Sequence, residues 1–262
     1  MLRTAAVSNI AQRLLTAVFP PSCPVCRDET GAPMALCPVC WRDLAFLGDN
    51  GCTTCGHPVP GCAGSEILQC DDCLHHPRTW SRGRAVFRYQ DTGRKLVLAL
   101  KHADRTDLAP MLADWAIRAG GSLIADADVI APIPVHWLRR LSRRRNQAAD
   151  LSRWISKRAG RRLAHMPGLL VRARATGNQD GKGRAARVEN VRKAFRATKD
   201  LTGKRVLLVD DVLTTGATMD EAARMCTLAG ARDVNILVLA LVTRDDSPYM
   251  RPQQEDNGDE TG

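Results

Sequence analysis

The sequence has 262 residues and a formal net charge of +10, with 44% hydrophobic, 25% charged and 4% aromatic residues. The hydrophobic and charged contents are ordinary for a globular protein, whereas aromatic residues are scarce and the net charge is unusually high. The length leaves room for one large domain and one small one. The longest apolar runs fall far short of the about 20 residues that cross a bilayer, so we expect no membrane span. We recognise no signal peptide and therefore expect a cytoplasmic protein, whose positive charge favours polyanions as partners.

The N-terminal segment, residues 1–19, is expected to form a short helix that docks onto the body of the protein. Its second half, Ile10 to Phe19, is mildly amphipathic. It lacks the long apolar region and the small-residue cleavage site of an export signal.

Nine of the ten cysteines lie between residues 23 and 73, and eight of them form four Cys-x-x-Cys pairs. A two-residue gap lets both thiolates of a tight turn face one metal ion, and two such pairs complete the tetrahedron that zinc prefers. The predicted ligands are Cys23, Cys26, Cys37 and Cys40 for one site, and Cys52, Cys55, Cys70 and Cys73 for another. We expect one or two structural zinc ions, because so short a segment with few large apolar residues needs metal to fold.

Two other uses of these cysteines are disfavoured. Disulfides would need an oxidising compartment, and thioredoxin-like chemistry would need a single Cys-x-x-Cys opening a helix in a βαβ unit. The spacing leaves open an interleaved arrangement in which the first pair joins the third. Cys62 is left over, and the nearby histidines are expected at the surface.

The middle of the chain combines a short strand with two basic stretches. Asp128 to Pro134 is an apolar strand that its prolines end. Between Arg139 and Arg162 there are ten Lys and Arg residues against one acid, and within this run Asn146 is expected to open an amphipathic helix. Residues 172–205 add eleven basic residues. Both a solvated surface and a polyanion-binding surface are compatible with these stretches.

The segment from Val206 to Thr218, VLLVDDVLTTGAT, carries the most specific pattern. Its first four residues are apolar, as in a buried parallel strand. Asp210 and Asp211 follow at the carboxyl end of that strand, where open α/β sheets bind ligands. A helix is expected next, and the T-x-x-E pattern of Thr218 and Glu221 places its start at Thr218. The expected buried stripe of this helix is Met219, Ala222, Ala223, Cys226 and Ala229, with Gly230 ending it.

This layout suits a phosphorylated sugar. Backbone N–H groups of the loop and of the helix start can surround a phosphate, while the two acids accept hydrogen bonds from sugar hydroxyls. Acids that only formed a turn would leave the adjoining small-residue loop unexplained. The predicted binding residues are Asp210, Asp211, Thr214, Thr215, Gly216, Ala217 and Thr218.

Val206–Thr218 resembles the phosphoribosyl pyrophosphate-binding signature of type I phosphoribosyltransferases. The resemblance implies an α/β fold with a mostly parallel sheet, and binding of phosphoribosyl pyrophosphate with Mg²⁺. It also implies that the turn at 135–145 and the flexible basic loop within 172–196 face the pyrophosphate. The matching basic residues are Arg144, Arg145, Lys182, Arg184 and Arg187.

The order of motifs along about residues 15–245 is similar to that of the ComF competence family, whose members join a zinc ribbon to a phosphoribosyltransferase domain. The motifs are the Cys-x-x-Cys pairs, Leu98–Lys101, Ala131–Pro134, Arg143 through Asn146-Gln147, Gln179 through Phe195, and the Val206–Thr218 segment. Arg144 and Arg145 replace a glycine and an aromatic residue of the family pattern, which puts base stacking at that turn in doubt and adds positive charge.

We therefore expect a double zinc ribbon at 20–76, a phosphoribosyltransferase-like domain at 80–245 and an acidic disordered tail at 246–262. The resemblance implies a role in the uptake or handling of single-stranded DNA during natural transformation, with competence-machinery proteins as partners. The alternative is a non-catalytic module that binds single-stranded DNA and is regulated by phosphoribosyl pyrophosphate. A third option is docking onto another protein through the zinc ribbons. If the protein is an enzyme, it is a glycosyltransferase whose acceptor and general base the sequence does not identify.

Overall fold

The computed structural model describes residues 20–48, 51–59, 68–102, 105–134, 146–159, 163–172 and 194–243. Several predicted features lie outside these residues: the N-terminal helix, the turn with Arg144 and Arg145, the loop with Lys182, Arg184 and Arg187, and the acidic tail.

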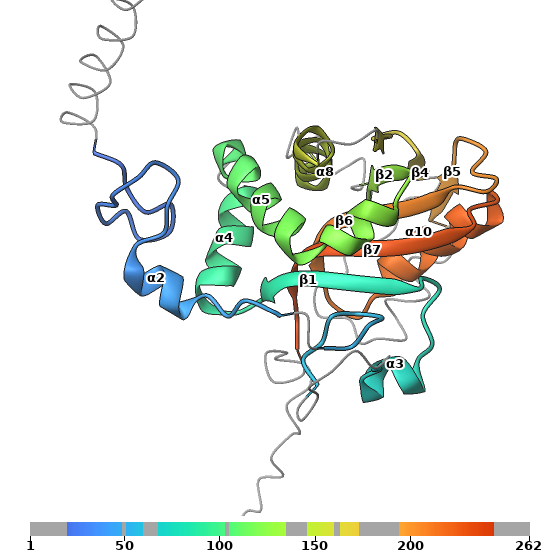
Figure 1. The fold of residues 1–262 in the computed structure, drawn as a ribbon, viewed down its shortest axis with the longest axis horizontal. Coiled ribbons are helices and arrows are strands. Elements are labelled where there is room, and N and C mark those ends of the chain that lie inside the picture. Colours follow the sequence, from blue (N-terminus) through green and yellow to red (C-terminus); the bar gives the residue numbers. More distant parts are fainter. Residues whose placement is uncertain are drawn as a thin grey trace, which may run out of the picture.

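The central element is a five-stranded parallel sheet in the order β1-β7-β6-β2-β3 (Figure 1). The strands are β1 Arg82–Arg88, β7 Asp233–Leu241, β6 Arg205–Leu213, β2 Val129–Pro132 and β3 Ala164–His165. The inner strands β6 and β7 are covered on both faces, which explains why each contains consecutive apolar residues instead of an alternating pattern. A separate antiparallel pair, β4 Leu170–Arg172 and β5 Phe195–Ala197, makes the fold mostly, rather than wholly, parallel.

One face of the sheet is covered by four helices, α4 Asp91–His102, α5 Ala109–Ala119, α6 Gly121–Asp126 and α8 Gln147–Arg158; the short 3₁₀ turn Thr106–Leu108 precedes α5. Leu96, Leu112 and Ile155 of these helices are fully buried in one cluster with Leu207 and Leu237 of the sheet. The predicted start of α8 is confirmed, because the Asn146 side chain accepts a hydrogen bond from the Ala148 N–H at 3.1 Å. Across the described ranges, we find no helix long and apolar enough to span a bilayer.

The opposite face is covered by α10 Ala217–Leu228 and the β4–β5 pair. The predicted stripe is confirmed at Met219, Ala222, Ala223 and Cys226, which are all buried. Gly230 adopts φ +93° just after the helix, as a glycine that ends a helix does.

The predicted N-cap of α10, Thr218, is wrong by two residues. The helix begins at Ala217, with Gly216 as its N-cap at φ +82°. Glu221 does not close a capping box with Thr218; its carboxylate is buried and forms a two-point ion pair with Arg224 at 2.9 Å. The Glu221 carboxylate therefore pairs with Arg224, three residues further along the same helix, and not with the backbone N–H groups at the helix start.

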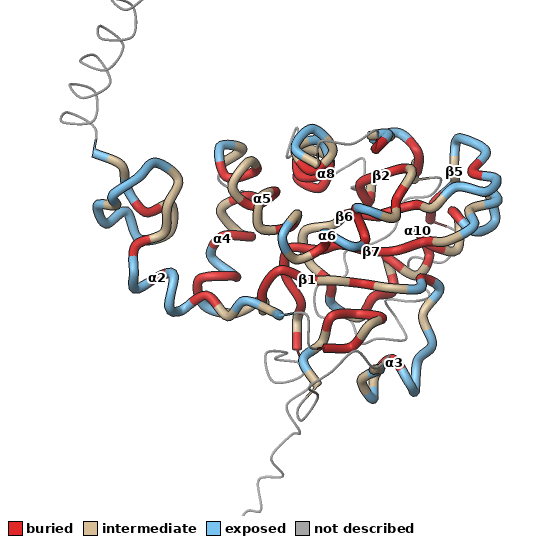
Figure 2. Tube along the Cα trace, in the orientation of Figure 1, coloured by how far each residue is buried: buried red, intermediate tan, exposed pale blue. Residues whose placement is uncertain are grey.

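The two cysteine-rich segments pack against opposite faces of the sheet. Val25 and Leu36 of the first segment, which includes α2 Pro38–Asp43, pack against the α4–α5 side. Cys52, Cys55 and Cys73 of the second, which includes α3 Asp71–His75, belong to the core shared with α10. Figure 1 shows α2 at one end of the molecule, far from α3, and Figure 2 shows that both short helices are exposed along much of their length.

Candidate functional site

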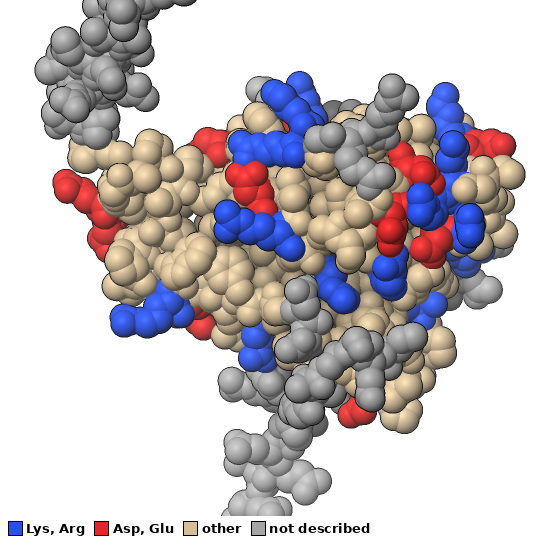
Figure 3. Space-filling view, in the orientation of Figure 1, with Lys and Arg blue, Asp and Glu red and all other residues tan. Residues whose placement is uncertain are grey.

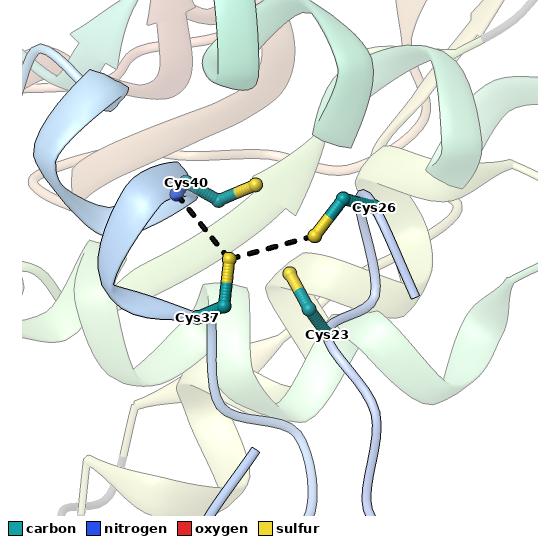
Figure 4. A group of neighbouring side chains, drawn as sticks. All are labelled: Cys23, Cys26, Cys37 and Cys40. Atoms are coloured by element: carbon teal, nitrogen blue, oxygen red, sulfur yellow. Dashed lines mark hydrogen bonds between the residues drawn. The ribbon is translucent and has the colours of Figure 1, made fainter. Parts of the chain in front are cut away.

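The first cysteine group brings four sulfur atoms together, and their side chains point toward one another (Figure 4). Cys23, Cys26, Cys37 and Cys40 have sulfur atoms that all lie within 4.8 Å of one another. Cys26 Sγ and Cys37 Sγ are 3.4 Å apart, and the Cys40 N–H donates to Cys37 Sγ at 3.5 Å. Four sulfurs bound tetrahedrally to zinc at about 2.3 Å would be separated by about 3.8 Å, so this group fits a zinc ion.

The second group, Cys52, Cys55, Cys70 and Cys73, has the same geometry. Cys55 Sγ and Cys70 Sγ are 3.6 Å apart. The grouping joins neighbouring Cys-x-x-Cys pairs and excludes the interleaved arrangement that the spacing left open. Cys70 and Cys73 lie at the start of α3, as Cys37 and Cys40 lie at the start of α2.

The two groups are copies of one structural unit. In each, the first pair sits in a tight turn flanked by an isolated antiparallel bridge, and the second pair opens a short helix. The residue after the first pair has positive φ in both copies, Arg27 at 70° and Gly56 at 79°. In both turns the N–H of that residue donates to the carbonyl of the first cysteine, at 2.9 Å to Cys23 and 2.8 Å to Cys52.

Interactions between neighbouring cysteines split the pKa values within each group: the pKa is lowered at Cys23 and at Cys52, while those of Cys26, Cys40, Cys55 and Cys73 are raised. Burial alone would raise the pKa of Cys23, but hydrogen bonds from the backbone at Cys26, Cys37 and Val25 outweigh it and lower the pKa to about 6. Hydrogen bonds from Cys55, Cys70 and Cys73 hold the pKa of Cys52 far below its ordinary value. By contrast, burial raises the pKa of Cys226 to about 12, so this cysteine of α10 is an inert core residue.

The acid pair lies within β6 instead of after it. Strand β6 continues to Leu213 along β7, so the predicted end of the strand at Val209 is too early. On its other side, however, the pairing with β2 stops at Pro132↔Val209. Proline has no N–H to continue that ladder. Asp210 and Asp211 therefore lie just beyond the end of a neighbouring strand, at the carboxyl edge of the sheet.

Basic residues of two elements act on the acids, and one of them forms an ion pair. Lys101 of α4 pairs with Asp211 at 3.0 Å, where the Asp211 side chain is 14% exposed. Burial and the neighbouring charge of Asp211 raise the pKa of Asp210 to about 7, while Lys101 and Arg172 of β4 act in the opposite direction. Asp210 Oδ1 also accepts a hydrogen bond from the Asp211 N–H at 2.9 Å. Neither acid is fully buried.

The loop after β6 leads directly into α10. Thr214 is exposed, Thr215 and Thr218 are half-buried, and Gly216 and Ala217 are buried. The first N–H groups of a helix have no partner within it, and Gly216 has no side chain to cap them. These N–H groups and the positive end of the helix dipole attract an anion.

Three basic residues of this region were not among the predicted site residues. Lys101 lies in a motif quoted for the family resemblance but had no assigned role, and Arg172 lies at the edge of a basic stretch. Arg78, half-way between the cysteines and β1, donates from Nη1 to the Thr215 carbonyl at 2.8 Å. No local pattern could have found Arg78, because its partners lie 137 and 142 residues away in the sequence.

Comparisons with known proteins agree with this architecture. Residues 14–74 match the model of the double zinc ribbon domain, and residues 151–258 match that of the phosphoribosyl transferase domain. The DNA utilization protein YhgH of Escherichia coli strain K12 is 31% identical over 237 residues, 84% of this chain and 96% of that protein. Competence protein F of Haemophilus influenzae is 25% identical over 229 residues, 78% of this chain and 96% of that protein.

Among solved structures, a purine phosphoribosyltransferase from Pyrococcus horikoshii is 21% identical, covers 52% of this chain and 72% of its own, and has a TM-score of 0.32. The predicted domain bounds and the roles of the individual sugar-binding residues stay predictions. The two matched domains, and the sequence identity over nearly the full length of the relatives, show that this chain belongs to the ComF family, which includes DNA utilization protein YhgH and competence protein F.

Proposed function

We propose that this chain binds phosphoribosyl pyrophosphate together with Mg²⁺ at the junction of β6 and α10. Asp210 and Asp211 hold the ribose hydroxyls, and Thr214–Thr218 holds the 5′-phosphate. The observation that carries the proposal is that two half-buried acids at the carboxyl edge of the sheet are followed by a glycine-capped helix start. A pentose phosphate is a ligand that needs both groups, acceptors for its hydroxyls and donors for its terminal anion.

The charges of the site support an anionic ligand. Lys101 offsets the charge of Asp211, so that the acid pair repels an approaching phosphate less than two free carboxylates would. Mg²⁺ binds through carboxylates and phosphate oxygens, and it would neutralise part of the pyrophosphate charge when bound. The predicted basic residues Arg144, Arg145, Lys182, Arg184 and Arg187 complete the proposal on the pyrophosphate side.

We further propose that the two cysteine groups each hold one structural zinc ion and that the protein works in the cytoplasm. Four cysteines that bind zinc must stay reduced, which a reducing compartment ensures. The names of the relatives concern DNA utilization and competence. We therefore place this chain in the handling of DNA, with single-stranded DNA as the nucleic acid and competence-machinery proteins as partners.

The net charge of the chain supports a DNA partner, and the structure shows how charged side chains are distributed on one face. The net charge is +10. On the face shown in Figure 3, however, basic and acidic side chains are interspersed. Binding that is led by backbone phosphates would weaken steeply as the salt concentration rises.

The ligand site is tested by calorimetry with phosphoribosyl pyrophosphate and Mg²⁺. The double variant Asp210→Asn, Asp211→Asn should lose affinity at least about a hundredfold, because it removes two charged hydrogen-bond acceptors, and should keep its zinc. The matched control is Asp126→Asn with Asp128→Asn, two acids at the amino end of the sheet. Unchanged affinity in the first variant would remove the acids from the site.

A second measurement separates an enzyme from a binding module. Release of pyrophosphate in the presence of Mg²⁺ and a panel of bases or amines identifies a phosphoribosyltransferase. Saturable binding without release, together with salt-sensitive binding of single-stranded DNA, identifies the module.

A further inference from the structure

The second cysteine group and the phosphate loop are joined by one buried side chain. Arg78 comes shortly after α3, and its guanidinium group is only 5% exposed. It forms an ion pair through Nη2 with Asp72, the neighbour of the ligand Cys73. Through Nη1 it donates to the Thr215 carbonyl at 2.8 Å and pairs with Asp220 at 3.3 Å. A single planar cation thus contacts both the cysteine unit and the first turn of α10.

The shape of the loop leaves room for this contact. A side chain at Gly216 would place its Cβ 2.6 Å from Arg78 Nη1 and 3.0 Å from the Trp80 ring. Gly216 is therefore required twice, for its φ of +82° and for the approach of Arg78. Arg78 stacks over the Trp80 ring at 5.4 Å, and the Trp80 Nε1 donates to the Thr54 carbonyl between Cys52 and Cys55 at 2.6 Å.

A second set of contacts ties the same segment to α10. The Thr79 N–H donates to Asp220 Oδ1 at 3.0 Å, and the Thr79 hydroxyl donates to the Asp220 carbonyl at 2.7 Å. Asp220 lies in the first turn of the helix, two residues after Thr218, the last of the predicted phosphate-binding residues. The segment 78–80 thus contacts both the Thr215 carbonyl of the loop and Asp220 at the start of α10.

Arg78 has one N–H donor, at Nε, that is available to hydrogen-bond with the cysteine ligands of zinc. Its Nε is buried without a hydrogen-bond partner among the described residues. Zinc-bound thiolates carry negative charge and accept hydrogen bonds from nearby donors.

We infer that Arg78 is a positioning residue through which the second cysteine unit, when it holds zinc, sets the conformation and the anion affinity of the phosphate loop. The inference rests on the proposed function in one respect only, that the loop binds a 5′-phosphate. Zinc at this unit then acts on ligand binding from outside the ligand site. The first cysteine unit packs on the opposite face of the sheet and has no part in this path.

The test compares Arg78→Lys with Arg84→Lys. Lysine keeps the charge but cannot contact Asp72, Thr215 and Asp220 at once, because it lacks the planar fork. Arg84 is the matched control: it also reaches the second unit, by donating to the Thr53 carbonyl at 3.5 Å, and it donates to the Gly83 carbonyl of its own strand at 2.9 Å, but no contact with the loop is found among the described residues. Zinc content, phosphoribosyl pyrophosphate affinity in the presence of Mg²⁺, and hydrogen exchange of the 214–220 amides are measured in each.

We expect Arg78→Lys to keep both zinc ions, to bind phosphoribosyl pyrophosphate about tenfold more weakly, and to exchange the 214–220 amides faster than the wild type. Arg84→Lys should match the wild type in the loop. Wild-type affinity together with wild-type exchange in Arg78→Lys would overturn the inference. Hydrogen exchange needs no ligand, so it decides the coupling even if the wild-type protein binds no phosphoribosyl pyrophosphate.

If Arg78→Lys does not fold, Asp220→Asn gives the same decision from the other side of the contact. This substitution keeps the shape of the side chain and weakens its pairing with Arg78 and Thr79. Faster exchange of the 214–220 amides at unchanged zinc content supports the coupling. Unchanged exchange contradicts it.

Discussion

Asp210 is a carboxyl group in surroundings that disfavour its charge. Its pKa is raised from 3.8 to about 7, first by burial and second by the charge of Asp211. Because the folded state holds the proton more tightly than the unfolded state, the protein loses stability as the pH rises from about 4 to about 7. A bound ligand with hydroxyl donors would favour the charged form and return part of this stability.

Replacing Asp210 by Asn should therefore stabilise the ligand-free protein at neutral pH. We expect the Asp210→Asn variant to exceed the wild type by on the order of 1–2 kcal/mol at pH 8, after allowance for solvent screening. The difference should shrink as the pH falls towards 5, where the wild-type carboxyl is protonated in the folded state. Urea unfolding from pH 5 to 8 measures this difference.

Asp128 is the control with the opposite sign. The Arg205 backbone N–H and then the Arg205 side chain lower its pKa, so the folded state favours its charged form. Asp128→Asn should be less stable than the wild type at neutral pH, with the difference closing as the pH falls through the lowered pKa. An Asp210→Asn variant that is no more stable than the wild type at pH 8 would contradict the electrostatic account of this residue.

Single residues also show where sequence reasoning reaches its limit. The acids and the small-residue loop were predictable, because one strand, one turn and one helix start follow one another within thirteen positions. Lys101 pairs with Asp211, and the charge of Arg172 acts on Asp210, only because α4 and β4 pack around the sheet. Arg78 depends on contacts with residues more than 130 positions later in the chain. Tertiary packing, not local pattern, decides such partners.

At the scale of elements, the repeated cysteine turn is strained in its first copy and not in its second, because only the second copy has glycine at the position with positive φ. Gly56 adopts φ +79° without strain, whereas Arg27 adopts φ +70°, a region that costs a non-glycine residue about 1 kcal/mol. Arg27→Gly should therefore strengthen zinc binding at the first site about fivefold, because metal binding and local folding are coupled. Competition with a chromophoric chelator measures the change.

Gly56→Ala tests the same turn in the opposite direction. Here the left-handed backbone and the contact of the new Cβ with the Ala85 N atom at 3.1 Å both act against the variant. We expect a loss of about 1–2 kcal/mol, which weakens zinc binding at the second site by at least about fivefold. Equal zinc affinities in wild type and both variants would show that the turn relaxes without cost.

The elements also show how far patterns determine boundaries. The four consecutive apolar residues from Val206 predicted β6, but not its continuation through Asp210 and Asp211 to Leu213. The acids remain in the strand because β7 keeps pairing with them while β2 ends at Pro132. Likewise, Gly216 replaces Thr218 at the helix start, since a left-handed glycine was needed where Arg78 approaches. In both places a neighbouring element shifted the boundary.

At the scale of the whole molecule, the two zinc units differ in how deeply they join the fold. Cys52, Cys55 and Cys73 are buried in the same core as Val206 of β6 and Ile236 of β7. The first unit forms a small cluster of its own, in which Val25 and Leu36 contact the helical face. Loss of metal at the second unit should therefore spread into the sheet, and loss at the first should stay local.

Cys55→Ser and Cys37→Ser test this difference as a pair. Each removes one zinc ligand, and each should bind one zinc ion fewer than the wild type. Because Cys55 is buried against the sheet core, we expect Cys55→Ser to lower the free energy of unfolding of the whole domain by several kcal/mol. Cys37→Ser should leave that transition within about 0.5 kcal/mol of the wild type.

Hydrogen exchange locates the effect. In Cys55→Ser the amides of β1, β6 and β7 should exchange faster, because β1 lies directly on the second unit, where the Gly83 N–H donates to the Thr53 carbonyl at 2.9 Å. In Cys37→Ser faster exchange should be confined to residues 20–48. If both variants shift the sheet equally, the two units stabilise the fold in the same way, and their separation into one integral and one peripheral zinc unit is wrong.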